Sequence, residues 1–508
     1  MKRPWNALLL SLSLTFVPTI AEANEETTAS PETPNTTVVE EKSEELLPDL
    51  TAADYDYLNT LLKADQLYEA GKQTEAIALY REAKPSFTAD NHQSSRTPYT
   101  DVSALPPDGK VYWQYGSADF NPKLRTKTLA PLELLVEKHP SFIPAHIRYG
   151  EALVYFEQTD AAINHLESAV SRYPQQLMLV ETLLPLYEQQ EQWLDASLTA
   201  RQFALLNSEH TQANHYKSLA DQHLESYERK LRASLRENAF ASLITGALSY
   251  ALTGSLLGPL SAIESTALLL QGESGVGDRL SDRLEKQLPL LEDEAVQQYV
   301  TEIGMDLTEY AGRDRFDYEF HVVMDENLNA FALPGGKIFI NAGAILKTKS
   351  EAELAGLIAH EISHAVLSHG FQLVTEGNLL ANVSQLIPYG GTAANLIVLN
   401  YSREMERQAD ELGTRLLASS DYAADGVYNL MVTLEAESKE QSRPPVWLST
   451  HPDTGERVNN IKTQIMANDY DRYRYEGIGR HLQIQEKVAT LLAEHQAKVE
   501  EGNETSED

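Results

Sequence analysis

The sequence predicts a mainly α-helical protein in which an α+β domain with a small β-sheet follows a long helical region. Three observations lead to this fold class. Residues 51–208 have a helical and weakly repetitive pattern. Residues 320–324 and 330–340 are typical of strands, with a Pro-Gly-Gly turn between the two halves of the second segment. Residues 354–367 then return to helical spacing, with apolar side chains around a polar trio.

The first 23 residues are typical of a cleaved signal peptide. A basic start precedes an apolar core at 7–17, and an A-x-A cleavage site ends at Ala23. The core has 11 residues, which is too short to span a bilayer, so we expect a mature chain that begins at Asn24. Because the sequence has no cysteine, it excludes lipid attachment through cysteine, disulfides and thiolate metal sites. These features predict a periplasmic protein.

The net charge is strongly negative, at −34 for the whole sequence and −35 without the signal peptide. Such a charge argues against nucleic acid and anionic membrane surfaces as partners. The acidic residues are concentrated at the two ends. Residues 24–50 carry eight acids against one lysine and predict a disordered leader, and residues 499–508 predict a similar acidic tail after a helix that begins near 481.

Residues 51–235 are expected to form a helical region with tetratricopeptide-like repeats. Pro140 and Pro174 are 34 residues apart, and so are Ala162 and Ala196. A period of 34 residues is the tetratricopeptide length, and such helix pairs stack around a concave face that can bind a protein partner. An ordinary helical bundle is the alternative, because residues 85–124 interrupt the period with a Gly- and Pro-bearing loop.

Residues 236–272 are expected to form an apolar helical hairpin. The stretch 239–263 has no charged residue and contains Gly254-x-x-x-Gly258, so a transmembrane helix is the alternative. However, basic residues lie just before it, and they would place that side of the chain in the cytoplasm, whereas the signal peptide has already exported it. We therefore predict a hairpin that is broken near Gly258 and packs on the next domain, with peripheral membrane contact at most.

The strongest chemical signal, His360-Glu361-Ile362-Ser363-His364, lies in the predicted domain at 273–480. On a helix, positions i and i+4 share a face, so His360 and His364 can offer two imidazoles to one metal ion. Glu361 lies beside them, where its carboxylate can accept a proton from water. The motif predicts a metal site with a general base.

A third ligand is expected from the polar stretch 401–413. Glu406 lies 42 residues beyond His364, and glutamate is a common third zinc ligand after a histidine pair. Asp410 follows one helical turn later, where it can hold the ring of a ligand histidine by a hydrogen bond. A third-histidine scheme requires histidine at 370, which is Gly370, and His369 is off the ligand face, so we expect it to be a non-ligand.

Four segments resemble one family in particular. HEISHAVLSHG, SREMERQAD and STHPDTGER, together with NAFALPGGKIFI before them, are similar to the family of CAAX prenyl protease and HtpX, and most of all to its soluble, exported BepA-like branch. The similarity covers residues 273–461, and the long apolar spans of the membrane-embedded members are lacking. It implies a gluzincin-type zinc metallopeptidase with one Zn²⁺ per chain held by His360, His364 and Glu406, with Asp410 in support.

The resemblance also places His451 and Arg457 near the cleft. A guanidinium or an imidazole there can stabilise the oxyanion of the tetrahedral intermediate. His451 can equally occupy the open zinc position in a resting form and exclude water. A plain capping loop, with Ser449, Thr450 or Asp453 as the cap, is compatible with either role.

Substrate is expected to bind as an added strand at a sheet edge, and residues Asn329, Ala330 and Phe331 are the candidates for that edge. The alternative is a buried hairpin without a substrate role. Residues 371–400 are rich in Leu, Gly and Ala and form either a lid over the cleft or a packed excursion.

The predicted function is hydrolysis of peptide bonds in protein or peptide substrates, in particular unfolded or misassembled envelope proteins. In this mechanism Glu361 accepts a proton from water and passes it to the leaving amine. The alternative is a chaperone or adaptor that binds unfolded clients through its repeats and rarely cleaves them. A purely structural zinc domain is the weakest of the three, because a general base beside an open metal position serves no structural end.

Overall fold

A computed structural model describes most of the chain. The described residues are 42–47, 51–84, 86–87, 98–236, 270–375, 387–389, 392–394, 401–440, 447–448, 451 and 456–504. The expected signal peptide, most of the acidic leader, the apolar stretch 239–263 and much of 371–400 lie outside them. Within the described ranges, no helix combines the length and the apolar character that crossing a membrane requires.

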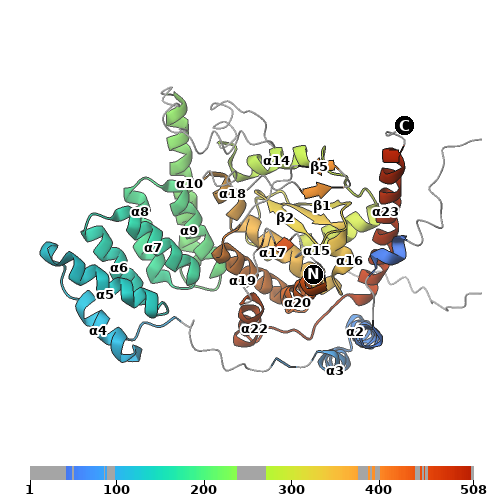
Figure 1. Cartoon of the computed structure of the whole chain (residues 1–508), viewed down its shortest axis with the longest axis horizontal. Helices are drawn as coiled ribbons and strands as arrows, with labels where there is room; N and C mark the ends of the chain where they lie inside the picture. Colours follow the sequence, from blue (N-terminus) through green and yellow to red (C-terminus); the bar gives the residue numbers. More distant parts are fainter. Residues whose placement is uncertain are drawn as a thin grey trace, which may run out of the picture.

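A series of helices, each packed on the next, forms one side of the molecule, in blue-green to green in Figure 1. They are α4 (Pro107–Gly116), α5 (Arg125–Lys138), α6 (Ile143–Tyr155), α7 (Thr159–Arg172), α8 (Leu177–Gln189), α9 (Trp193–Leu206) and α10 (Ala213–Arg236). The starts of α6 and α8, at 143 and 177, and those of α7 and α9, at 159 and 193, are each 34 residues apart. Ala162 and Ala196 are completely buried at equivalent places. The boundaries follow the 34-residue spacing, and the tetratricopeptide assignment stays a prediction.

The helix pair α2 (Ala52–Glu69) and α3 (Gln73–Ala83) packs elsewhere, although the sequence grouped it with the repeats. Its core includes Ile478, at the start of α23 (Ile478–Glu504). Asp65 accepts hydrogen bonds from the main-chain N–H groups of Glu476 (3.0 Å) and Ile478 (2.8 Å). Buried Lys84, just after α3, forms an ion pair of 2.7 Å with Asp425. A buried ammonium group requires carboxylate partners, and these lie in the C-terminal half, so the helical residues 51–235 divide into two packing units.

The sheet has three strands in the order β1-β3-β2. β1 (Glu319–Val323) runs parallel to β3 (Lys337–Asn341), and β2 (Ala330–Leu333) runs antiparallel to β3. Gly335 and Gly336 make the turn between β2 and β3 at φ +78° and +91°, in the left-handed region that favours glycine. These strands are the predicted ones, and the expected fold class, mainly helical with a small sheet, is confirmed.

Helices cover the sheet and build the centre of the molecule (Figure 1). Helix α17 (Glu351–Val366) is buried along its whole length and packs on the sheet, on α15 (Glu294–Thr308) and on α19 (Arg403–Ser419). Helix α14 (Gly272–Leu284) packs against β2 and β3. Further α-helices and strands are α16 (Ala342–Lys347), α18 (His369–Thr375), β4 (Ile387–Tyr389), β5 (Thr392–Ala394), α20 (Gly426–Glu440) and α22 (Arg457–Ala467).

Candidate metal centre

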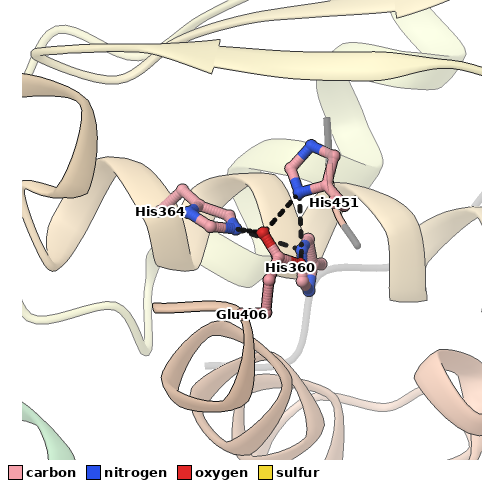
Figure 2. Close-up of side chains that lie close together, drawn as sticks. All are labelled: His360, His364, Glu406 and His451. Atoms are coloured by element: carbon pink, nitrogen blue, oxygen red, sulfur yellow. Dashed lines mark hydrogen bonds and ion pairs between the residues drawn. The ribbon is translucent and has the colours of Figure 1, made fainter. Parts of the chain in front are cut away.

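The predicted histidine pair lies on one face of α17. This helix begins where the Ser350 hydroxyl accepts a hydrogen bond from the main-chain N–H of Glu353, at 3.1 Å. One turn apart in the second half of the helix, His360 and His364 place their Nε2 atoms 3.1 Å from each other. Both side chains are buried, so the two imidazoles converge on one point inside the protein, as Figure 2 shows.

Glu406 reaches that point from α19. The Ser402 side chain caps this helix, with a hydrogen bond of 3.2 Å from the main-chain N–H of Met405. The two helices approach closely at Gly413, where a Cβ would lie 3.2 Å from main-chain atoms of α17. The Glu406 oxygens are 3.4 Å from His360 Nε2 and 3.5 Å from His364 Nε2. The predicted third ligand is therefore next to the histidine pair.

His451 completes the group from a different segment of the chain. Its Nδ1 atom is 2.9 Å from Glu406 Oε1 and 3.4 Å from His360 Nε2. The donor atoms of His360, His364, Glu406 and His451 all lie within 4.8 Å of one another, and all four residues are buried. We call these four residues the buried cluster. Their spacing would allow them to hold one metal ion.

Asp410 lies behind His360, as its spacing from Glu406 predicts. Its Oδ1 atom is 3.0 Å from His360 Nδ1, so it can accept a hydrogen bond from that nitrogen and leave Nε2 to face the cluster. Burial alone would raise the pKa of Asp410, but the charge and hydrogen bonds of Arg457 outweigh it and lower this pKa. Asp410 therefore stays a carboxylate and keeps the His360 ring in one orientation.

Arg457 is next to the cluster but is placed differently from an oxyanion donor. Its Nε and Nη2 atoms donate to the two oxygens of Asp410, both at 2.7 Å. Its Nη1 atom is 3.1 Å from Glu406 Oε2 and donates to the main-chain oxygen of His451 at 3.4 Å. Because every guanidinium nitrogen already contacts a protein oxygen, the geometry favours a positioning role over the direct catalytic contact that the resemblance implied.

Glu361, the candidate base, is completely buried beside the cluster. Its Oε1 atom accepts a hydrogen bond from Trp447 Nε1 at 3.1 Å and is 3.6 Å from His451 Nε2. Burial raises the pKa of Glu361, against the opposing charges of His451 and His360. Its Oε2 atom has no hydrogen-bond partner among the described residues, so one carboxylate oxygen is left to receive a proton.

The donor set fits a divalent metal ion. Imidazole nitrogens and one carboxylate are the ligands that zinc takes in catalytic sites. Buried polar atoms are normally hydrogen-bonded, yet Glu361 Oε2 and His451 Nε2 lack a partner within the part of the chain that the structure describes. Such atoms are expected where a metal ion and water are bound.

The sequence around this geometry is similar to a known family. Residues 294–465 match the pattern of peptidase family M48. The chain is 24% identical over 275 residues to the beta-barrel assembly-enhancing protease of Escherichia coli, which covers 48% of this chain and 56% of that protein. It is 26% identical over 242 residues to the protein of that name in Yersinia pestis, and this match covers 42% of this chain and 50% of that protein.

A third relative is a mitochondrial protein of a plant. The mitochondrial metalloendopeptidase OMA1 of Arabidopsis thaliana is 30% identical over 248 residues, with 46% of this chain and 49% of that protein covered. The chain spans about half the length of the curated relatives it matches.

Three aromatic side chains within residues 294–465 contact the buried cluster, and the sequence did not predict these contacts. The Tyr401 ring stacks on His364, with ring centroids 3.7 Å apart. Trp447 stacks on His451 at 4.4 Å and also donates to Glu361. Tyr401 is five residues before Glu406, and Trp447 is four residues before His451. This proximity in the sequence was the signal that could have predicted the two contacts.

The third is His369, which the sequence predicts to be a non-ligand and which lies behind His364. Its Nε2 atom is 2.9 Å from Gln408 Oε1, and its Nδ1 atom is 3.1 Å from His364 Nδ1. Since an amide oxygen only accepts, Nε2 of His369 donates and its Nδ1 accepts from His364. Burial lowers the pKa of His369 to about 4, which keeps it neutral. This arrangement turns His364 Nε2 toward the cluster, as Asp410 does for His360.

The proposed substrate edge is the side of β2 that faces away from β3, where Asn329 and Ala330 are buried. Strand order leaves β2 paired only with β3 among the described strands, and α17 packs on β2. Phe331 stacks on Phe339 of β3, with centroids 5.1 Å apart. Asn329 precedes the strand, and its buried Oδ1 atom has no partner among the described residues. The three candidates are therefore at a sheet edge next to the helix that carries the histidine pair.

Proposed function

We propose that this protein is a zinc-dependent endopeptidase of the gluzincin type. The observation that carries this proposal is the buried cluster of four metal-binding donors with Glu361 directly beside it, inside an M48 domain. The cluster offers three imidazoles and a carboxylate, and two further residues orient the rings. A metal site with a purely structural role does not require this arrangement. A chaperone or adaptor with latent or rare proteolysis is not favoured, because it would make little use of this arrangement.

In this proposal one Zn²⁺ is held by His360, His364 and Glu406. When bound, zinc supplies a Lewis acid that polarises the scissile carbonyl and makes water a stronger acid. Asp410 and His369 keep the two ligand rings oriented, and Arg457 holds both Asp410 and Glu406. The ligand positions are then fixed before substrate arrives, which lowers the cost of ordering the site.

Glu361 moves the proton. Its Oε2 atom accepts a proton from the attacking water and later gives it to the leaving amine, while Trp447 holds Oε1. Burial favours the protonated form of this carboxyl and so supports its use as an acid in the second step. His451, whose Nε2 atom faces Glu361, is the candidate for contact with the oxyanion or for the fourth metal position.

Substrate would pair with β2 as an extra strand. The main-chain N–H of Asn341 donates to the Asn329 oxygen at 3.0 Å, so the alternation of an antiparallel ladder points the main-chain groups of Ala330 away from β3. Two residues further along the strand, the Ala332 oxygen, which also points away from β3, accepts a hydrogen bond of 3.4 Å from the Tyr401 hydroxyl. Ala330 is thus the strand position that we propose for pairing with a peptide main chain. Because Ala330 is completely buried, its surroundings must open before substrate pairs there.

The substrates proposed are unfolded or misassembled proteins of the bacterial envelope. The relatives in Escherichia coli and Yersinia pestis are named beta-barrel assembly-enhancing proteases, and the first 23 residues are typical of an export signal. Both support a periplasmic location. An extended main chain bound at a strand edge is available in unfolded proteins and absent from most folded surfaces, which supports this substrate class.

The test is Glu361→Gln, which removes the proton acceptor and keeps the side-chain shape. We expect zinc content to stay at wild type and cleavage of an unfolded model protein, such as reduced casein, to fall by about 10²–10⁴-fold. Glu309→Gln, an exposed change of the same kind at the end of α15, serves as the control and is expected to cleave normally. Wild-type cleavage by Glu361→Gln would show that Glu361 is not the base.

A further inference from the structure

Helix α19 lies between the metal-binding helix α17 and the ends of two helices of the helical region, α7 and α9 (Figure 1). It presents a different set of side chains to each side. Glu406 and Asp410 face the cluster. Arg407, Glu411 and Arg415, each four residues after the last, contact the helical region.

The two arginines bind the C-terminal ends of helices. Arg415 Nη1 donates to the Leu206 oxygen at 2.7 Å, and its Nη2 donates to the Leu205 oxygen. Arg407 donates to the oxygen of Arg172, the last residue of α7. The last carbonyls of a helix have no partner within the helix, and a cation there is favoured by the helix dipole. Both contacts therefore satisfy groups that the helical region leaves open.

Helix α9 also binds the other metal-binding helix. Gln202, on α9, donates from Nε2 to the oxygen of Leu367 at 3.0 Å. Leu367 caps the C-terminal end of α17, one residue after the last helical position. One helix outside the M48 match thus holds α17 through Gln202 and α19 through the carbonyls that Arg415 binds.

We propose that α9 is part of the scaffold that positions the metal ligands, with Arg415 and Gln202 as positioning residues for the metal centre. This inference rests on the proposed zinc site. His360 and His364 are on one of the helices that α9 holds, and Glu406 is on the other. A shift of α19 relative to α17 changes the distance from Glu406 to the imidazoles, and metal binding depends on that distance. A protein ligand that moves α9 would therefore change the metal site.

The test is to measure the zinc affinity of the full-length protein by competition with a chromophoric chelator. We expect Arg415→Gln to weaken zinc binding by about tenfold. Loss of a residue that orients a metal ligand typically weakens metal affinity by about 10–100-fold, and Arg415 acts at the lower end of this range because it acts through a helix. Arg415→Lys should recover part of the loss, since an ammonium group can still donate to a helix carbonyl. Arg125→Gln, an exposed arginine of the helical region, is the control and should bind zinc as wild type does.

Two results would overturn the proposal. One is wild-type zinc affinity in Arg415→Gln, even with a lower Tm, because a contact that only stabilises the fold would lower Tm alone. If Arg415→Gln fails to fold, Gln202→Ala, which loses one hydrogen bond, replaces it: weaker zinc binding supports the proposal and unchanged binding overturns it. Failure of the wild type to bind zinc or to cleave would instead refute the proposed function, so the two failures are distinguishable.

Discussion

Among the described residues, two groups of side chains have the spacing of a metal site. The first is the buried cluster of His360, His364, Glu406 and His451. The second consists of Glu285, Glu319 and His321, whose donor atoms also lie within 4.8 Å of one another. Spacing alone does not separate them.

The surroundings of the two groups differ in three respects. The side chains of the buried cluster are at most 1% exposed, whereas those of Glu285 and Glu319 are 38% and 39% exposed. The buried cluster has three imidazoles and the second group has one. A buried lysine, Lys337, already pairs with Glu319 at 2.6 Å. Lys337 satisfies Glu319, while the buried Nε2 atom of His321 has no hydrogen-bond partner among the described residues. The burial of the carboxylates and the number of imidazoles, more than distance, therefore distinguish the proposed metal centre from the second group.

The largest effect is expected from a substitution that removes a ligand of the buried cluster and leaves the second group unchanged. Glu406→Gln removes the anionic ligand, and we expect zinc in the purified protein to fall from about one per chain to well below that, by elemental analysis. Glu319→Gln removes the corresponding carboxylate of the second group and should leave the zinc content as it is. Full occupancy in Glu406→Gln would exclude this residue from the ligands.

A smaller effect is expected from Asp410→Asn. The change removes the charge behind His360 and weakens the two hydrogen bonds from Arg457. We expect zinc affinity, measured by chelator competition, to weaken by about 10–100-fold. Asp278→Asn, which loses an ion pair with Lys337 beside the second group, is the matched control. Equal affinities for the two variants would mean that Asp410 does not orient the ligand.

The smallest effect expected is that of His451→Ala. Since His451 lies within the donor group, we predict that it occupies the fourth metal position at rest, and its removal should raise cleavage of unfolded casein by up to about tenfold, equivalent to about 1.4 kcal/mol. An oxyanion donor would behave in the opposite way, with turnover lower by about 10²–10³-fold. The sign of the rate change therefore decides between the two roles.

Local pattern was sufficient to predict the elements that carry the site. The strands, the helix with His360 and His364, and the helix with Glu406 each have a periodic pattern of their own, so their existence and order could be derived from the sequence. The placement of Asp410 behind His360 also followed, because one helical turn fixes it relative to Glu406.

Contacts between distant segments could not be predicted in this way. Lys84 pairs with Asp425 and Glu476 across more than 300 residues, and no periodicity indicates that partner. Arg457 was expected near the cleft, but its pairing with Asp410 depends on how α22 packs against α19. His369 was expected to be a non-ligand, and its hydrogen bond to His364 follows from the end of α17 at Leu367.

The most direct test is the position of zinc in crystals of the full-length protein, from anomalous differences at the zinc absorption edge. We expect one peak in contact with His360, His364 and Glu406 and no peak beside Glu285, Glu319 and His321. A peak at the second group alone, or no zinc at the buried cluster in protein that cleaves casein, would contradict it.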